Sequence, residues 1–221
     1  MRFFSVFFAV FFALPASAAS FDCAKASTEI EHAICDDPEL SRLDEEIALA
    51  YDQLLPTSRY FEFIRDNQRA WLKKDRSNDP HVFEQRLNYL QSYMTLATCF
   101  EGAETPRDCL INERDALDYC MGDGGYTTVA MDSCSAAMAG AWDSIMAVET
   151  EIKRGSLVDD IDTLMIFDEA SEAFETYRQT ECGWQYSEYR HGTIRGQIWF
   201  GCYLDLTSNR VLALISGNRM H

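Results

Sequence analysis

The stretch FDCAKASTEIEHAICDDPELSRLDEEIALAY, residues 21–51, predicts two consecutive helices separated by a tight turn. Thr28 and Glu31 have the spacing of a capping box at the start of the first helix. Asp37-Pro38 then supplies an N-cap followed by a proline at the first helical position. The apolar residues of the second helix fall three and four positions apart over 40–54, which is typical of an amphipathic helix. This stretch therefore favours a helical fold.

Helical spacing continues along the rest of the chain, and strand signals are weak throughout. We expect a long helix from Thr127 or Thr128 to Gly155, closed by that glycine. An antiparallel partner is expected over 157–182, and a last helix begins at about Thr193. The predicted fold class is all-α.

We expect two related helical hairpin units in tandem, residues 19–98 and 127–221, joined by a disulfide-rich linker over 99–126. Gly196 and Gly201 lie inside the last predicted helix. Because an interior glycine costs about 1 kcal/mol relative to alanine, we expect a neighbouring helix to approach closely at both positions.

The amino terminus has the features of a signal peptide, residues 1–18. An apolar run over 3–14 is too short to span a membrane and ends at Pro15, and Ala16-Ser17-Ala18 supplies the small residues of a cleavage site. We therefore expect a periplasmic or secreted protein with no membrane anchor after cleavage.

The two units share an order of signals that predicts an internal duplication: paired cysteines, a long helix, a second helix with a central aromatic residue, and Arg-x-x-x-Leu near the end. In the first unit, the last two signals are Trp71 and Arg86. In the second unit, they are Phe174 and Arg210.

Eight cysteines in an exported chain predict disulfides rather than metal ligation, and no CxxC pair is present. Only the second unit carries a later cysteine pair. Both of these later cysteines are missing from the first unit together, which suggests that Cys182 bonds Cys202. By the same logic, Cys23 bonds Cys35. The remaining four allow three connectivities, of which 99–109 with 120–134 is preferred; they are Cys99, Cys109, Cys120 and Cys134.

Residues 21–51, followed by QRAWLKKDR over 68–76, resemble the N-terminal domain of the LprI-like lysozyme-inhibitor family. FETYRQTEC over 174–182 and LTSNRVLAL over 206–214, preceded by Cys202, are similar to a second, more divergent copy of it. The first copy departs from the family pattern, since its Asp75-Arg76 order is reversed and the later cysteine pair is missing. The resemblance implies a secreted helical inhibitor or binding module.

The motif residues are expected to be mainly structural. We expect four aromatic residues to fill the helix–helix core: Trp71, Trp142, Phe174 and Tyr177. Arg178 and Arg210 are expected to form an ion pair with a carboxylate such as Asp205 or to cap helix carbonyls, and Arg76 completes the motif in the first copy.

The formal net charge of −17, from 19 basic and 36 acidic residues, argues against nucleic-acid binding, because a phosphate backbone would be repelled. A basic protein such as a lysozyme is the expected partner, since opposite charge accelerates association. The second half carries most of the excess: without the expected signal peptide, which contains Arg2, nine bases oppose 21 acids after residue 98, against nine and 15 before it.

Two segments are candidate contact surfaces. The densest acidic run places Asp168, Glu172 and Glu175 on one helical face, although such a run is more often a solvated surface. The second segment, over 184–191, is expected to be an aromatic-rich loop tethered at both ends by a 182–202 bridge, and its residue types are those of binding hot spots. Its candidates are Trp184, Tyr186, Tyr189 and Arg190.

We therefore expect no enzyme, no cofactor and no metal, but a protein that docks on a cationic peptidoglycan hydrolase. Neighbouring acids at the surface lack the burial that raises a catalytic pKa, and the Asp159-Asp160-x-Asp162 cluster lacks the glycine and final glutamate of a calcium loop. The alternative is an envelope adaptor with no hydrolase target. The sequence does not fix the oligomeric state.

Overall fold

The computed structural model describes residues 19–54, 56–103, 105–122 and 127–218; the expected signal peptide lies outside these ranges. All regular elements in the described ranges are helical, which confirms the all-α prediction. They are α1 (Glu29–Asp36), α2 (Pro38–Asp52), α3 (Phe61–Lys74), α4 (Pro80–Gly102), α5 (Cys109–Gly122), α6 (Thr128–Ser156), α7 (Ile161–Glu188) and α8 (Arg195–Asn218), with 3-10 turns at Cys23–Lys25 and Pro106–Asp108.

The predicted caps of the first two helices are present. The Thr28 hydroxyl accepts a hydrogen bond from the Glu31 amide at 3.3 Å, and the Glu31 carboxylate accepts from the amides of Ser27 and Thr28 at 2.8 and 3.0 Å. These bonds, with Ser27 contributing most, lower the pKa of Glu31 to about 2. Asp37, which directly precedes Pro38, accepts a hydrogen bond from the Glu39 amide. The turn between α1 and α2 is therefore fixed by local hydrogen bonds.

Several helices extend further than their sequence signals indicate. Helix α4 continues past Cys99 to Gly102, and α7 continues past Cys182 and Gly183 to Glu188. The expected loop over 184–191 is therefore wrong for its first five residues, which are helical. Gly155 also lies inside α6, which ends one residue later. Without a proline or a competing cap, a single glycine does not end a helix whose next turns pack against a neighbour.

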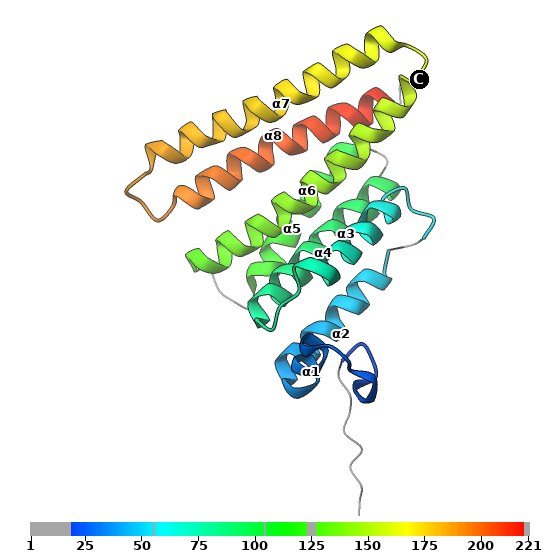
Figure 1. Ribbon diagram of the computed structural model, residues 1–221. Helices are drawn as coiled ribbons and strands as arrows, with labels where there is room; N and C mark the ends of the chain where they lie inside the picture. Colours follow the sequence, from blue (N-terminus) through cyan, green and yellow to red (C-terminus); the bar gives the residue numbers. More distant parts are fainter. Residues whose placement is uncertain (1–18, 55, 104, 123–126, 219–221) are drawn as a thin grey trace, which may run out of the picture.

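Figure 1 shows α6, α7 and α8 as three long helices that alternate in direction, with α7 at the outer edge of the molecule. Helix α8 packs against both α6 and α7, and α4 packs against α6 on its other side. Helix α2 then packs on α4, and α1 on α2. In the predicted second unit, α8 thus packs against both other long helices, and α7 contacts chiefly α8.

A continuous apolar core runs from Ile34 to Ile215 through both predicted units. The two units meet along α4 and α6, where Phe100 and Trp142 pack edge to face with ring centroids 5.6 Å apart. The Tyr89 hydroxyl also bonds Ser144 at 2.8 Å across this contact. Both halves therefore share one buried interior.

Four disulfides confirm the preferred cysteine pairing. Cys23 bonds Cys35, and Cys182 bonds Cys202. The middle four cysteines pair as 99–109 and 120–134, and no free cysteine remains. The 182–202 bridge joins α7 to α8 across their connection.

The expectation of close helix contact at the two glycines of α8 holds at one of them. A β-carbon on Gly196 would lie 2.6 Å from the Asp132 Oδ1 atom of α6, so α8 approaches α6 closely there. A β-carbon on Gly201 would meet no atom within 4 Å, and the expectation was wrong at that position.

Candidate functional site

Arg178 is the centre of a polar network that holds α6, α7 and α8 together. Its side chain leaves α7 and is only 3% exposed. The guanidinium donates to Asp143 of α6 and to the Thr207 hydroxyl of α8, both at 2.6 Å, and to Glu175 of its own helix at 2.5 Å. The Tyr203 hydroxyl donates to the other Asp143 oxygen at 2.8 Å. One arginine thus joins three helices.

Burial sets the protonation of this network. Desolvation alone disfavours the charged guanidinium, but the hydrogen bond and charge of Asp143 outweigh it, so the pKa of Arg178 is raised. Desolvation, together with the Asp143 carboxylate, raises the pKa of Tyr203. The network therefore contains a charged guanidinium and a neutral phenol.

The expected ion pair of Arg178 is confirmed, but its partner is Asp143 rather than Asp205, whose side chain is exposed on α8. Arg210 makes no ion pair within the described residues. Its guanidinium lies 5.5 Å from the Phe174 ring centroid and donates to the Ser171 hydroxyl at 3.2 Å. Arg210 thus covers an aromatic face at the edge of the core.

The first unit contains similar contacts. Arg76 lies 3.9 Å from the buried carboxylate of Asp44. Arg86 lies 5.4 Å from the Trp71 ring centroid and donates to the Gln68 side chain. Trp71 is buried and packs edge to face against Phe83, as expected for a core residue. In both units, an arginine therefore covers the central aromatic residue and bonds the side chain three positions before it.

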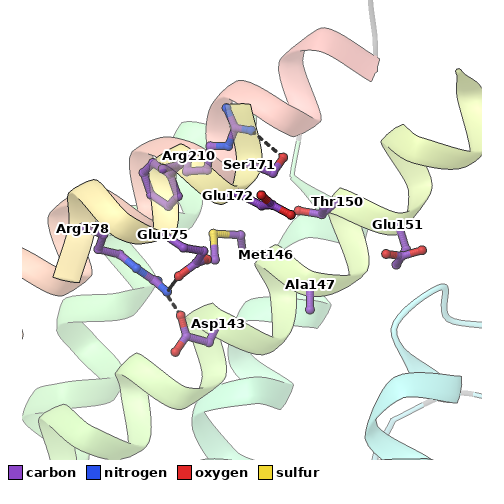
Figure 2. A pocket seen from close by; sticks show the side chains of 11 residues that line it. Asp143, Met146, Ala147, Thr150, Glu151, Ser171, Glu172, Glu175, Arg178 and Arg210 are labelled. Carbon is purple, nitrogen blue, oxygen red and sulfur yellow. Dashed lines mark hydrogen bonds and ion pairs between the residues drawn. The ribbon is translucent and has the colours of Figure 1, made fainter. Parts of the chain in front are cut away.

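A cavity of about 440 Å³ opens beside Arg178, between α6 and α7. Figure 2 shows Arg178 and Asp143 at one end, Arg210 and Ser171 at the other, and Met146 between them. Glu172 of α7 projects toward Thr150 of α6 near the Arg210 end (Figure 2). Acidic and apolar side chains thus line one open groove.

The structure separates the three expected acidic contact residues. Asp168 forms an ion pair with Arg154 at 2.8 Å, which links α7 to α6, and Glu175 is bound by Arg178. Glu172 forms no ion pair within the described residues and lines the cavity. Two of the three carboxylates therefore already have an intramolecular cation.

The expected aromatic contact residues gather at the far end of α7. Trp184 and Tyr189 are about half exposed, whereas Tyr186 is partly covered by the Arg195 guanidinium at 5.1 Å. Arg190 is exposed and donates to the Ser187 carbonyl at 3.2 Å. Tyr186 and Arg190 line a second cavity of about 480 Å³ between the start of α6 and the α7–α8 connection.

One expected core residue, Tyr177, lies outside the core. Its side chain is 53% exposed, whereas Phe174 is partly buried against the core cluster, and Trp142 is fully buried. Tyr177 and Arg178 are adjacent on α7 and point about 100° apart, so burying Arg178 turns Tyr177 toward solvent. The expectation that Tyr177 fills the core was wrong.

Sequence reasoning missed the exposed apolar residues at the start of α7. Val158, Ile161, Met165 and Ile166 each expose more than half of their side-chain surface. An excess of apolar positions over one helical face was the available signal.

Within the described ranges, no helix has the length and apolar character of a membrane span, and no group of three or more His, Cys, Asp or Glu could hold a metal.

The family model of Lysozyme inhibitor LprI matches residues 120–214. The match covers the 120–134 and 182–202 disulfides, all of α6 and α7, and most of α8. It confirms the LprI-like resemblance for this part of the chain. A second copy over 19–98 stays a prediction. No curated protein and no solved structure matched the chain.

Proposed function

We propose that this chain, LprI-like over residues 120–214, is an exported, non-catalytic inhibitor that binds a basic lysozyme or a related peptidoglycan hydrolase. Export to the periplasm or beyond agrees with four disulfides, which persist in oxidising compartments. The observation that carries the proposal is the match of the second unit to a family named for lysozyme inhibition.

The charge of the second unit suits such a target. The described acids of α7 include Asp162, Asp168, Glu169, Glu172 and Glu175, whereas its one basic residue, Arg178, is buried. The surface of α7 therefore presents negative charge without interspersed cations. Long-range attraction to a basic protein would raise the association rate, and salt would screen it.

The direct contacts are assigned to the exposed residues of α7 and its C-terminal end. Trp184, Tyr189 and Arg190 have hot-spot side chains and are accessible, with Tyr186 beside them. Of the three acidic candidates from the sequence, only Glu172 is left for binding, while Asp168 and Glu175 act chiefly in joining the helices.

An inhibition assay tests this function. Purified oxidised protein is titrated against representative lysozymes of the animal classes, with lysis of bacterial cell walls as the readout. We expect inhibition at micromolar protein or below, weaker by about tenfold or more when the ionic strength rises from about 20 to 500 mM. An acidic helical protein of similar size serves as the control for charge alone.

Two results would overturn this function. Absence of inhibition and binding against every lysozyme class removes the hydrolase target, and recovery of a stable envelope complex would then favour the adaptor alternative. Turnover of purified peptidoglycan by the protein itself, lost on substitution of its glutamates by glutamine, would contradict the non-catalytic assignment.

A further inference from the structure

Helix α7 is apolar on two sides. Its inner side carries Phe167, Phe174 and Cys182, which pack in or against the core. On its outer side, apolar residues recur at intervals of three, four and seven positions, and together we name them the outer seam: Ile166, Ala170, Ala173, Tyr177 and Trp184. Such intervals keep side chains on one face of a helix.

The outer seam is open to solvent along its whole length. Ile166, Tyr177 and Trp184 are 67%, 53% and 48% exposed, and both alanines are exposed. A rise of 1.5 Å per residue makes the seam about 27 Å long. Figure 1 shows α7 at the edge of the molecule, with α8 along only one side of it. No element in the described ranges covers the seam.

Carboxylates flank the seam on both sides. The 100° turn per residue places Asp162 and Glu169 along one edge and Glu181 and Glu188 along the other. No ion pair joins these four residues to a cation within the described ranges. The face is thus an apolar strip between two acidic edges, the arrangement in which an apolar patch with a polar rim marks a binding surface.

We propose that the outer seam is the surface that docks on the hydrolase, and that its occupant is a cationic protein face presenting apolar side chains among lysines and arginines. This inference rests on the function proposed above. The long alkyl stems of lysine and arginine can lie along Tyr177 and Trp184 while their charged ends reach the acidic edges. A second copy of this chain fits poorly, because two seams face to face would bring acidic edges together.

Binding measurements on paired variants test the apolar part of the surface. The probe is a lysozyme that the wild-type protein inhibits. We expect Tyr177→Ala and Trp184→Ala each to weaken binding about tenfold or more, because large exposed aromatics are typical hot spots. The matched control is Leu49→Ala on α2, since Leu49 is 58% exposed but lies in the first unit. Its dissociation constant should match that of the wild type.

A second pair tests the acidic edges. Glu169→Lys and Glu45→Lys change the net charge equally, and both glutamates are exposed, but Glu45 lies on α2. We expect Glu169→Lys to slow association at least several-fold more than Glu45→Lys at low salt, with the difference shrinking at high salt. Circular dichroism confirms that each variant keeps its helices.

The outcomes separate the two proposals. Wild-type inhibition that all seam variants retain unchanged overturns the seam but keeps the inhibitor function. Failure of the wild type to bind any lysozyme overturns both. Sedimentation of the wild type as a dimer that Tyr177→Ala and Trp184→Ala convert to a monomer would show that a second copy occupies the seam, and would overturn the cationic partner.

Discussion

Two arginine–aspartate pairs join α7 to α6, and they differ in burial. Arg178 is almost fully buried where it binds Asp143, whereas the side chains of Arg154 and Asp168 are 43% and 40% exposed. Removing Arg178 leaves Asp143 and the Thr207 hydroxyl without their shared cation. Exposed pairs, by contrast, contribute little because water already solvates both groups.

We therefore expect Arg178→Ala to lower the free energy of unfolding by about 2–4 kcal/mol, somewhat below the range for fully buried pairs because Asp143 is partly exposed. The matched change Arg154→Ala should cost less than about 1 kcal/mol. Urea unfolding of the oxidised protein, followed by circular dichroism, measures both. Equal losses in the two variants would contradict the role given to Arg178.

The family motif was sufficient to predict Arg178 as a structural residue, but not its partner. Asp205 is near Arg210 in sequence, yet it faces solvent on α8. The informative signal was a shared spacing: Asp44 follows Cys35 by nine residues, and Asp143 follows Cys134 by nine. Both carboxylates meet an arginine from further along the chain, a long-range pairing that helical periodicity alone cannot specify.

The two glycines of α8 differ in whether the surrounding structure leaves room for a side chain. Gly201 is exposed with open space around its α-carbon, so Gly201→Ala should stabilise the protein by up to about 1 kcal/mol through helix propensity. At Gly196, an added methyl group would displace the Asp132 carboxylate, which accepts a 2.7 Å hydrogen bond from Gln197. We expect Gly196→Ala to lose most or all of that gain, or to destabilise the protein.

Thermal unfolding of the two alanine variants gives the comparison directly, since they make the same chemical change on one helix. A larger gain at Gly196 than at Gly201 would mean that α6 and α8 are further apart than the structure shows. The sequence pattern located both glycines inside a helix but could not tell them apart. Only the position of α6 decides which glycine is needed.

Helix ends were less predictable than helix faces for the same reason. The apolar spacing correctly indicated that α7 follows α6 as a partner, but Gly183 suggested an end that does not occur. The 182–202 bridge and the contacts of Tyr186 with Arg195 hold the next turn against the start of α8. Tertiary contacts here outweigh the local preference of one glycine.

Across the whole molecule, matching contacts support the proposed duplication. Arg86, Trp71 and Gln68 in the first unit correspond to Arg210, Phe174 and Ser171 in the second. The copies differ in surface charge and in the second disulfide of the later unit. The duplication stays a prediction. It suggests that the first unit supports α6, while the second unit binds the hydrolase.

A buried acid joins the two predicted units. Glu149 of α6 is fully buried, accepts from the Tyr60 hydroxyl at 2.6 Å and lies 3.0 Å from the Arg59 guanidinium. Both partners precede α3, so this carboxylate joins the two predicted units. Desolvation, followed by the bond to Glu149, raises the pKa of Tyr60, which stays a neutral donor.

Tyr60→Phe removes one donor from a buried carboxylate and should lower the free energy of unfolding by about 1.5–3 kcal/mol. Tyr89→Phe is the control across the same interface: its partner Ser144 still donates to the Gly140 carbonyl, so the loss of unfolding free energy should stay near about 0.5–1.5 kcal/mol.

Because one core spans both predicted units, we expect a single urea transition that coincides by circular dichroism and tryptophan fluorescence. Two separated transitions in the wild type would show that the units fold independently, and Glu149 would then not couple them.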